Sequence, residues 1–426
     1  MSMERYSKYK ESGVSWVGQI PEQWEIKQLR SFLSLFSEKG HGDAQLLSVT
    51  REQGVIVRDK DDKEENHNFV PDDLSGYKYI EKGDFAINKM KAWQGSYAVS
   101  CFDGIVSPAY FTCKLRGVDK EFFSRAIRSK AYVPFFTQYS KGIRVGQWDL
   151  DPNALKSIPF FLPPLPEQQK IVSYLESKTS SIDAYVAEKE KELQLLNELK
   201  EAEIANVVTR GLNPDVKMKD YNSLLTDSCP EHWSIMRNKS FLSLTGEKVG
   251  DRANDYTLLS LTTKGVIVRD VESGKGKFPK DFDTYQAVKK DELVFCLFDI
   301  DETPRTVGLV ESEGMVTGAY TALKVNKSIA IPEYVYYYYL CVDNIKALKP
   351  YYSGLRKTVR ADKFLQIYIP LPPVEEQRAI VTYVEDKCAK VNTLIAELEA
   401  EIDYLKEYKQ RLIADCVTGQ VNVQNT

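Results

Sequence analysis

The chain has 426 residues, too many for one hydrophobic core, and this length suits two domains with connecting elements. With 43% apolar and 28% charged residues it has the composition of an ordinary globular protein, and its opening residues lack the apolar core of a secretory signal. The sequence offers no run of about 18 uncharged apolar residues to cross a bilayer. We therefore expect a cytoplasmic protein with no membrane partner.

The cysteine and histidine patterns exclude further classes. The seven cysteines are scattered and never spaced Cys-x-x-Cys, which favours reduced structural thiols over a disulfide framework or a zinc site. The three histidines lie far apart and match no metal-binding pattern. We expect no metal and no cofactor. The net charge of −4 leaves nucleic-acid binding open, because local charge decides contact with phosphates.

Residues from about 20 to 160 carry short β-rich runs broken by turns, with one helical segment. The runs lie at 54–57, 84–87, 96–99 and 109–112, and the segment 120–130 has a helical pattern. This mixture predicts an α+β globule with a curved sheet.

A proline-rich joint at 159–166 ends this pattern, and a long helix is predicted after it. Prolines are tolerated at a helix entry, and Glu167 adds a carboxylate where the helix dipole is positive. The sequence contains no proline or glycine from there to about Thr209, which predicts one helix of about 42 residues, roughly 63 Å long. A second long helix is predicted from Val374 to about Thr418.

Both predicted helices carry an apolar stripe at three-and-four spacing. The second has the cleaner stripe, at Ile380, Val384, Lys387, Val391, Leu394, Leu398, Ile402, Leu405, Lys409 and Leu412. The first has a looser version, at Ile171, Leu175, Ile182, Val186, Leu193, Leu196 and Val207. Stripes this long exceed what one globule covers, so we expect the helices to pair as an antiparallel coiled coil. Two separate helices, each packed on its own globule, are the alternative.

The second half of the chain repeats the first about 209 residues later. The segment 162–169, LPPLPEQQ, returns at 371–378 as LPPVEEQR, and 21–24, PEQW, returns at 230–233 as PEHW. Such a repeat predicts an approximate twofold axis, which suits a target with two half-sites or two identical partners.

Two basic, aromatic-bearing windows occupy matching places in the repeat. The sequence has no acidic residue between Phe122 and Trp148, nor from Asn344 to Ala361. Glycine lets a loop approach a phosphate, and Arg or Lys binds phosphates or forks onto guanine. The DNA-binding candidates here are Lys141, Arg144, Lys349, Arg356, Lys357 and Arg360. The alternative is that these windows are solvated surface.

A second pair of segments occupies matching places in the repeat but differs in amino-acid sequence. Residues 88–95 read NKMKAWQG, whereas 296–306 read CLFDIDETPRT. An insert that differs between two copies of a shared framework can give each copy its own DNA sequence preference. Lys89, Lys91, Gln94 and Arg305 are therefore candidates to face base edges. In the alternative, Met90 and Trp93 belong to the core and the charges are merely solvated.

These segments together resemble the specificity subunit of type I restriction–modification enzymes. The resemblance rests on 12–24, on 87–95 with 104–110, on 295–306 with 317–320, and above all on the doubled Leu-Pro-Pro-x-x-Glu-Gln before a long helix. It implies two α+β target-recognition domains, separated by the paired helices and each reading one half of an interrupted double-stranded DNA sequence. It also implies that the helices act as a spacer, that two methyltransferase subunits dock on them, and that motor-nuclease restriction subunits join the complex.

On this resemblance the first recognition domain spans 1–158 and the first joint with its helix 159–212. The second recognition domain spans 213–368, and the second joint with its helix 369–426.

The sequence carries no sign of catalysis. Neither the Asn-Pro-Pro-Tyr or Asp-Pro-Pro-Tyr motif of amino-methylation nor the phosphate-binding Gly-x-x-x-x-Gly-Lys-Ser/Thr loop occurs. We therefore expect a non-catalytic subunit with no catalytic residues of its own. A cryptic DNA-modifying enzyme and a coiled-coil scaffold that never touches DNA are the competing interpretations.

Overall fold

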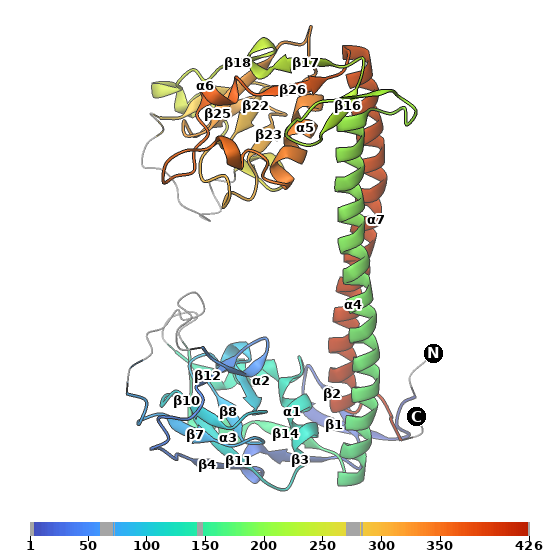
Figure 1. The fold of residues 1–426 in the computed structure, drawn as a ribbon. Helices are drawn as coiled ribbons and strands as arrows, with labels where there is room; N and C mark the ends of the chain where they lie inside the picture. Colours follow the sequence, from blue (N-terminus) through green and yellow to red (C-terminus); the bar gives the residue numbers. More distant parts are fainter. Residues whose placement is uncertain are drawn as a thin grey trace. The chain divides into compact units, whose positions relative to one another are not determined.

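The structure is a computed structural model that describes residues 4–59, 71, 73–142, 148–269, 282 and 284–424. It divides into two compact units (Figure 1). Unit 1 comprises Met1–Glu190 and Ala400–Thr426, and unit 2 comprises Lys191–Glu399. Each unit therefore contains one globular part and a portion of each of two long helices. In the described part of the chain, none of the helices has the length and apolar character needed to span a membrane.

The globular part of unit 1 is built on a four-stranded antiparallel sheet in the order β4-β11-β8-β9. The strands are β4 (Leu33–Phe36), β11 (Phe111–Leu115), β8 (Phe85–Ile87) and β9 (Tyr97–Val99). Helix α1 (Lys120–Arg128) begins where the Asp119 side chain accepts a hydrogen bond from the Phe122 amide at 2.9 Å. Phe123 of this helix packs edge-on against Phe85 of the sheet, with ring centroids 5.2 Å apart. The predicted α+β globule is confirmed.

Short two-stranded pairs and helices complete unit 1. The pairs are β1 (Tyr9–Val14) with β2 (Gly18–Pro21), β3 (Glu25–Gln28) with β14 (Pro159–Leu162), β5 (Leu47–Thr50) with β6 (Gly54–Val57), β7 (Lys78–Ile80) with β10 (Gly104–Val106), and β12 (Ser140–Lys141) with β13 (Asp149–Leu150). The helices are η1 (Leu29–Ser31), η2 (Ala92–Gln94), α2 (Val133–Tyr139) and α3 (Pro152–Ser157).

Unit 2 repeats this plan, with a second sheet in the order β18-β25-β22-β23. Its strands are β18 (Leu242–Leu244), β25 (Thr321–Val325), β22 (Leu293–Phe295) and β23 (Val307–Leu309). The other pairs are β15 (Met218–Asp220) with β16 (Ser228–Pro230), β17 (Ser234–Arg237) with β26 (Tyr368–Leu371), β19 (Leu259–Thr262) with β20 (Gly265–Val268), and β21 (Gln286–Val288) with β24 (Gly314–Val316). Its helices are η3 (Asn238–Ser240), η4 (Gly250–Asp255), α5 (Pro332–Asn344), η5 (Lys349–Tyr351) and α6 (Ala361–Phe364). The internal repeat predicted from the sequence is thus a repeat of fold.

The two long helices are α4 (Leu165–Arg210), with 46 residues, and α7 (Val374–Val417), with 44. In unit 1, Lys409 of α7 binds Asp183 of α4 at 2.6 Å, and in unit 2, Lys200 of α4 donates to Asn392 of α7 at 2.9 Å. Residue numbers rise along α4 as they fall along α7, so the helices run antiparallel and lie side by side in each unit (Figure 1). The predicted antiparallel coiled coil is confirmed.

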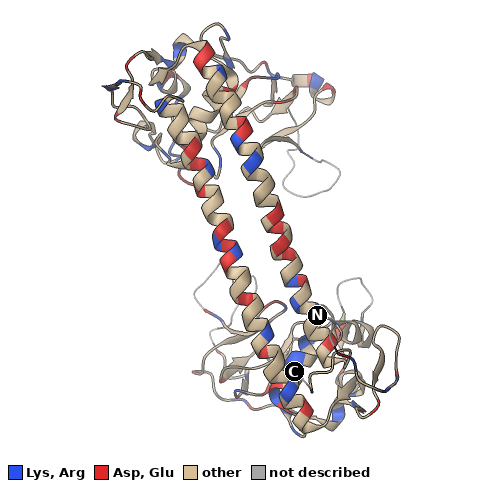
Figure 2. Ribbon diagram, turned by 90° about the vertical axis from the view of Figure 1, so that its right-hand side faces the viewer, with Lys and Arg blue, Asp and Glu red and all other residues tan. Residues whose placement is uncertain are grey.

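The seam of the coiled coil follows most of the predicted stripe. Of the predicted stripe, Val186 and Ile402 are buried in unit 1 and Val384 and Leu398 in unit 2; Ile204 is also buried but was not part of the prediction. Leu394 differs, because it is 48% exposed on the outer face of α7. Charged residues of both signs follow one another along both helices (Figure 2), as expected for their solvated faces.

The doubled Glu-Gln at the helix entries fastens each globule to its long helix. Gln168 donates to the Pro163 carbonyl at 2.8 Å and accepts from the Asp119 amide at 2.9 Å. Gln377 repeats both bonds, to the Pro372 carbonyl and from the Ile331 amide, each at 2.8 Å. Both glutamines are buried. The most specific sequence mark of the chain is therefore a structural joint.

The glutamate before each glutamine binds a tryptophan. Glu167 accepts from the Trp24 indole at 2.8 Å and from the Tyr6 hydroxyl at 2.6 Å. Glu376 accepts from the Trp233 indole at 3.1 Å. The repeated Pro-Glu-x-Trp segment and the repeated Glu-Gln thus form the same contact in each unit.

Candidate nucleic-acid interface

In unit 1 the structure brings the two predicted DNA-binding segments together. Lys89 binds Asp149 of β13 through its side chain at 2.9 Å, and its carbonyl accepts from the Leu150 amide at 3.1 Å. Trp93 packs on Trp148, with ring centroids 5.1 Å apart. The segment 88–95 and the hairpin that carries Lys141 are therefore neighbours, although about 50 residues separate them in the sequence.

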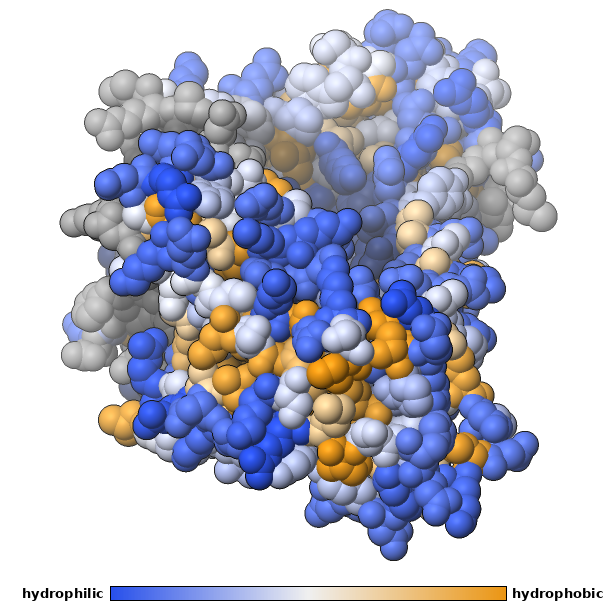
Figure 3. Space-filling model, turned by 90° about the horizontal axis from the view of Figure 1, so that it is seen from above, coloured by the Kyte–Doolittle hydropathy of each residue, from blue (hydrophilic) through white to orange (hydrophobic). Residues whose placement is uncertain are grey.

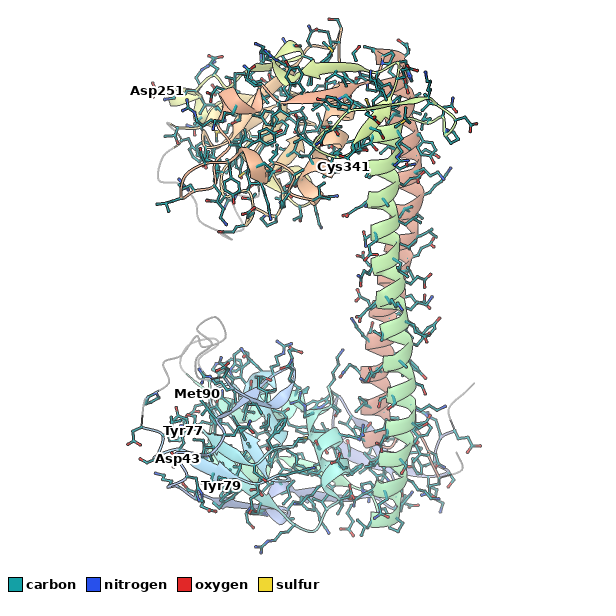
Figure 4. All side chains as sticks on the ribbon, viewed as in Figure 1. Asp43, Tyr77, Tyr79, Met90, Asp251 and Cys341 are labelled. Atoms are coloured by element: carbon teal, nitrogen blue, oxygen red, sulfur yellow. The ribbon has the colours of Figure 1, made fainter. Side chains whose placement is uncertain are left out.

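A hollow of about 650 Å³ lies between this segment and the β5–β6 pair. Two predicted residues, Lys91 and Gln94, line it. Met90 and Tyr77, both labelled in Figure 4, line it as well. Met90 is 52% exposed, so the interpretation of Met90 as a core residue is wrong.

The hollow is lined by polar groups of the kinds that pair with bases and phosphates. Asn88 is buried, and its amide nitrogen donates to the Tyr110 hydroxyl at 3.3 Å. Its Oδ1 atom has no hydrogen-bond partner among the described residues. A side-chain amide can pair with adenine, and arginine can pair with guanine or phosphate. Arg51 and Arg58 also line the hollow.

Sequence reasoning missed most of these lining residues. Arg51, Tyr77 and Tyr110 come from three separate segments, and their approach depends on how the small sheets stack. Arg58 had a usable signal, because the segment GVIVRD at 54–59 recurs at 265–270 with Arg269 in the same place.

Of the two candidates in the first basic window, the structure places only Lys141, which is not among the residues that line the hollow. Lys141 is exposed on β12. Arg144 lies outside the described residues.

In unit 2 the corresponding segments also meet, but here the acidic residues lie on the first segment, 296–306, whereas in unit 1 Asp149 lies on the hairpin. The loop between β22 and β23 touches the loop after η5, because the Asp299 amide donates to the Arg356 carbonyl at 2.9 Å and the Val359 amide to the Leu297 carbonyl at 2.8 Å. Asp301 lies 3.5 Å from Lys349 and 3.2 Å from Lys357. The predicted cations of unit 2 are thus paired within the unit.

These ion pairs shift the ionisation of the groups involved. Partial desolvation favours the protonated form of Asp301, but Lys357 and Lys349 outweigh it, so the pKa of this carboxyl lies below its ordinary value. Hydrogen bonds to Asp301 and Glu302 raise the pKa of Lys357. Asp301 and Lys357 are therefore both charged at neutral pH.

The remaining predicted residues of unit 2 hold local structure or stand at the surface. Arg305 donates to Asn344 at 2.8 Å and pairs with the buried Asp343 at 3.2 Å, and its side chain is 18% exposed. Arg356, with a side chain 78% exposed, lies 3.8 Å from Asp299. Arg360 pairs with its neighbour Asp362 at 3.1 Å.

The described residues contain no cluster of three or more His, Cys, Asp or Glu side chains placed to hold a metal ion. Unit 1 offers hydrogen-bonding and charged groups around a hollow, and unit 2 offers them on its contacting loops.

The fold defines a two-repeat protein, with two α+β globules and an antiparallel coiled coil. Residues 311–404 match the family model described as the type I restriction modification DNA specificity domain. The resemblance to specificity subunits of type I restriction–modification systems is confirmed, and it extends along almost the whole chain.

Three relatives illustrate this similarity. The type I restriction enzyme MjaVIII specificity subunit of Methanocaldococcus jannaschii is 21% identical, and the match covers 95% of each chain. A second chain of this archaeon, named as an MjaX specificity subunit, is 21% identical over 96% of each chain. The EcoBI specificity subunit of Escherichia coli is 22% identical over 72% of this chain and 66% of its own.

A solved structure shares the fold. It is described as the structural basis of complex assembly and conformational transition of the type I restriction–modification system. It aligns with a TM-score of 0.64 at 16% identity and covers 94% of this chain and 99% of its own.

Proposed function

We propose that this chain is the DNA-specificity subunit of a type I restriction–modification complex, that it reads a two-part target, and that it catalyses no reaction by itself. The observation that supports this most is the doubled unit. Each unit brings a variable loop and a basic loop together on a shared framework. Two recognition domains with different loop sequences suit two different DNA half-sites.

We assign one half-site to each recognition domain, with boundaries at 1–158 and 213–368. The joints with their helices span 159–212 and 369–426. Within these domains the DNA-contacting residues of the proposal are Lys89, Lys91, Gln94, Lys141, Arg144, Arg305, Lys349, Arg356, Lys357 and Arg360. The hollow in unit 1 supports the assignment of Lys91 and Gln94 as DNA-contacting residues, since both side chains border a cavity large enough for a base.

The paired helices set the distance between the half-sites in this proposal. An insertion of seven residues in each helix, after Glu190 in α4 and after Glu399 in α7, keeps the apolar seam in phase and lengthens the pair by about 10 Å. At 3.4 Å per base pair this corresponds to about three extra unspecified base pairs. A variant that reads different half-site bases instead would contradict the spacer role.

The partners of the proposal are double-stranded DNA, two methyltransferase subunits and the motor-nuclease restriction subunits. Large apolar side chains stand exposed at repeated positions of the coiled coil. Leu195 of unit 2 is 55% exposed and its counterpart Tyr404 of unit 1 is 68% exposed; Leu394 is 48% and its counterpart Tyr185 is 42% exposed. Exposed apolar residues at equivalent places suit two copies of one partner. Figure 3 shows further apolar residues among hydrophilic ones on the face that it presents.

A protein that surveys DNA together with such partners belongs in the cytoplasm, and this location is part of the proposal.

The decisive experiment co-expresses the chain with its methyltransferase and maps methylated bases by methylation-sensitive sequencing. The expected result is one interrupted motif with a fixed gap. Methyl transfer by the chain alone, with DNA and S-adenosylmethionine, would show it to be an enzyme. A complex whose binding to duplex DNA is absent or independent of salt would favour a scaffold.

A further inference from the structure

A groove of about 670 Å³ lies within unit 1 between helix α1 and the paired long helices. Its walls come from the exposed face of α1, the β5–β6 turn, and the unit 1 segments of α4 and α7. The residues that carry the argument are Arg51, Arg125, Arg128, Lys130, Asp183 and Lys409.

The groove is strongly basic in a chain that is acidic overall. Five basic and two acidic side chains line it. Arg51 pairs with Glu52 at 3.2 Å and Lys409 with Asp183 at 2.6 Å. Within the described part of unit 1, the other three cations form no ion pair with a carboxylate. The groove therefore carries a surplus of positive charge.

Each of these three cations is held in place differently. Arg128 donates to the backbone carbonyls of Tyr97 at 3.1 Å, Arg51 at 3.1 Å and Glu52 at 2.8 Å. Arg125 has a buried Nε atom without a partner among the described residues. Lys130 is exposed just beyond the end of α1. Arg128 thus anchors the β5–β6 turn, while Arg125 and Lys130 are available to an anion.

The groove adjoins the hollow. Arg51 and Gln94 line both cavities, so the two cavities are neighbours on unit 1. An elongated polyanion that places bases at the hollow can therefore place phosphates along the groove.

Unit 2 lacks this charge at the equivalent place. The amides of Asp119 and Ile331 bind equivalent glutamines and so fix the alignment of α1 with α5. In this alignment the positions of Arg125, Arg128 and Lys130 are taken by Tyr337, Leu340 and Val342. The basic groove is a feature of unit 1.

We propose that this groove holds the sugar–phosphate backbone of DNA beside the first half-site, and that the first half-site is bound through more phosphates than the second. The inference rests on the proposed function. Backbone contacts carry no sequence information but fix register and contribute affinity that falls with salt. The first unit then supplies much of the hold on DNA.

The test uses the complete complex of this chain with its methyltransferase subunits. In the double variant Arg125→Gln/Lys130→Gln, the slope of log affinity against log salt should become shallower by about 0.9 for each phosphate that the variant no longer neutralises. Affinity should fall by the same factor for the target and for a random duplex. The matched control is Arg30→Gln/Arg116→Gln, which removes the same charge from exposed positions of unit 1 outside the groove and should leave the slope unchanged.

Two further variants keep the outcome decisive. The charge-retaining Arg125→Lys/Lys130→Arg should restore the slope, and the single change Lys130→Gln at an exposed position should lower it by half as much. An unchanged slope in the double variant would overturn the proposed binding of phosphates in the groove while leaving the proposed specificity function intact. Failure of the double variant to assemble with the methyltransferase subunits would identify an acidic protein surface as the occupant of the groove and would overturn the proposal too. A wild-type complex that does not bind its own methylated motif would overturn the proposed function itself.

Discussion

The two units share their joints but differ in the candidate DNA-binding loops. The Trp24–Glu167 and Trp233–Glu376 contacts are the same, and each buried glutamine makes the same two bonds. At the loops the units diverge, because unit 1 lines its hollow with Lys91 and Gln94, whereas unit 2 places Asp301 against its lysines. A shared framework with different loops allows one fold to bind two different DNA sequences.

The largest expected effect tests whether the joints are equivalent. Trp24→Ala and Trp233→Ala should each destabilise their own unit by about 3–5 kcal/mol, because each removes a buried indole and its bond to a glutamate. Hydrogen exchange resolved along the chain measures this, since two units need not unfold in one step. A loss of protection that spreads equally through the other unit would show that the units do not fold as separate bodies.

The glutamines of the joint give the next effect. Gln168→Ala leaves the Asp119 amide and the Pro163 carbonyl without their bonds, which should cost about 2–4 kcal/mol. Gln377→Ala should cost slightly more, because Gln377 also donates to the Ile329 carbonyl at 3.1 Å. The exposed neighbour Gln169→Ala is the control, with little expected change. If Gln168→Ala and the control are equally stable in thermal unfolding, the hydrogen bonds of the joint do not stabilise the unit.

The sequence was sufficient for the elements whose signal is local or periodic. The long helices have three-and-four apolar spacing, and they begin and end within about two residues of the predicted positions. Helix α1 begins at Lys120 as predicted. The repeat required only comparison of the two halves.

The candidate sites were less accessible, because they depend on side chains from distant segments. The approach of Arg51 to Gln94, and of Asp301 to Lys357, follows from how loops pack rather than from any spacing in the chain. The same limit explains Leu394, since the stripe at this turn continues through the half-buried Ile395, one residue later. Periodicity identifies a face to within a residue, and packing decides which member is buried.

Substitutions in the candidate DNA-binding loops of one unit should affect only the half-site assigned to that unit. Gln94→Ala should reduce discrimination at the first half-site by about 1–3 kcal/mol, and Arg356→Ala should act similarly at the second half-site only. Competition binding with duplexes altered in one half-site at a time measures both. Gln23→Ala, at an exposed position outside the hollow, is the control. A change at both half-sites from either substitution would contradict one reader per unit.

The smallest effect concerns the acidic residues that distinguish unit 2. Asp301→Asn removes a charge that pairs with Lys349 and Lys357, so these lysines should bind phosphates more freely. The salt dependence of binding to random duplex should steepen by about 0.9 for each additional phosphate neutralised, and Asp251→Asn on η4, labelled in Figure 4, should not steepen it.

The pKa of Asp301 sets the pH at which this difference disappears. Its carboxyl has a lowered pKa, so the ion pairs persist at neutral pH and are lost only as the pH falls below the ordinary range of aspartate. Wild type and Asp301→Asn should therefore differ at neutral pH and converge only under acid conditions. A difference that vanishes near pH 6 would instead assign the effect to a group other than Asp301, because this carboxyl is still ionised there.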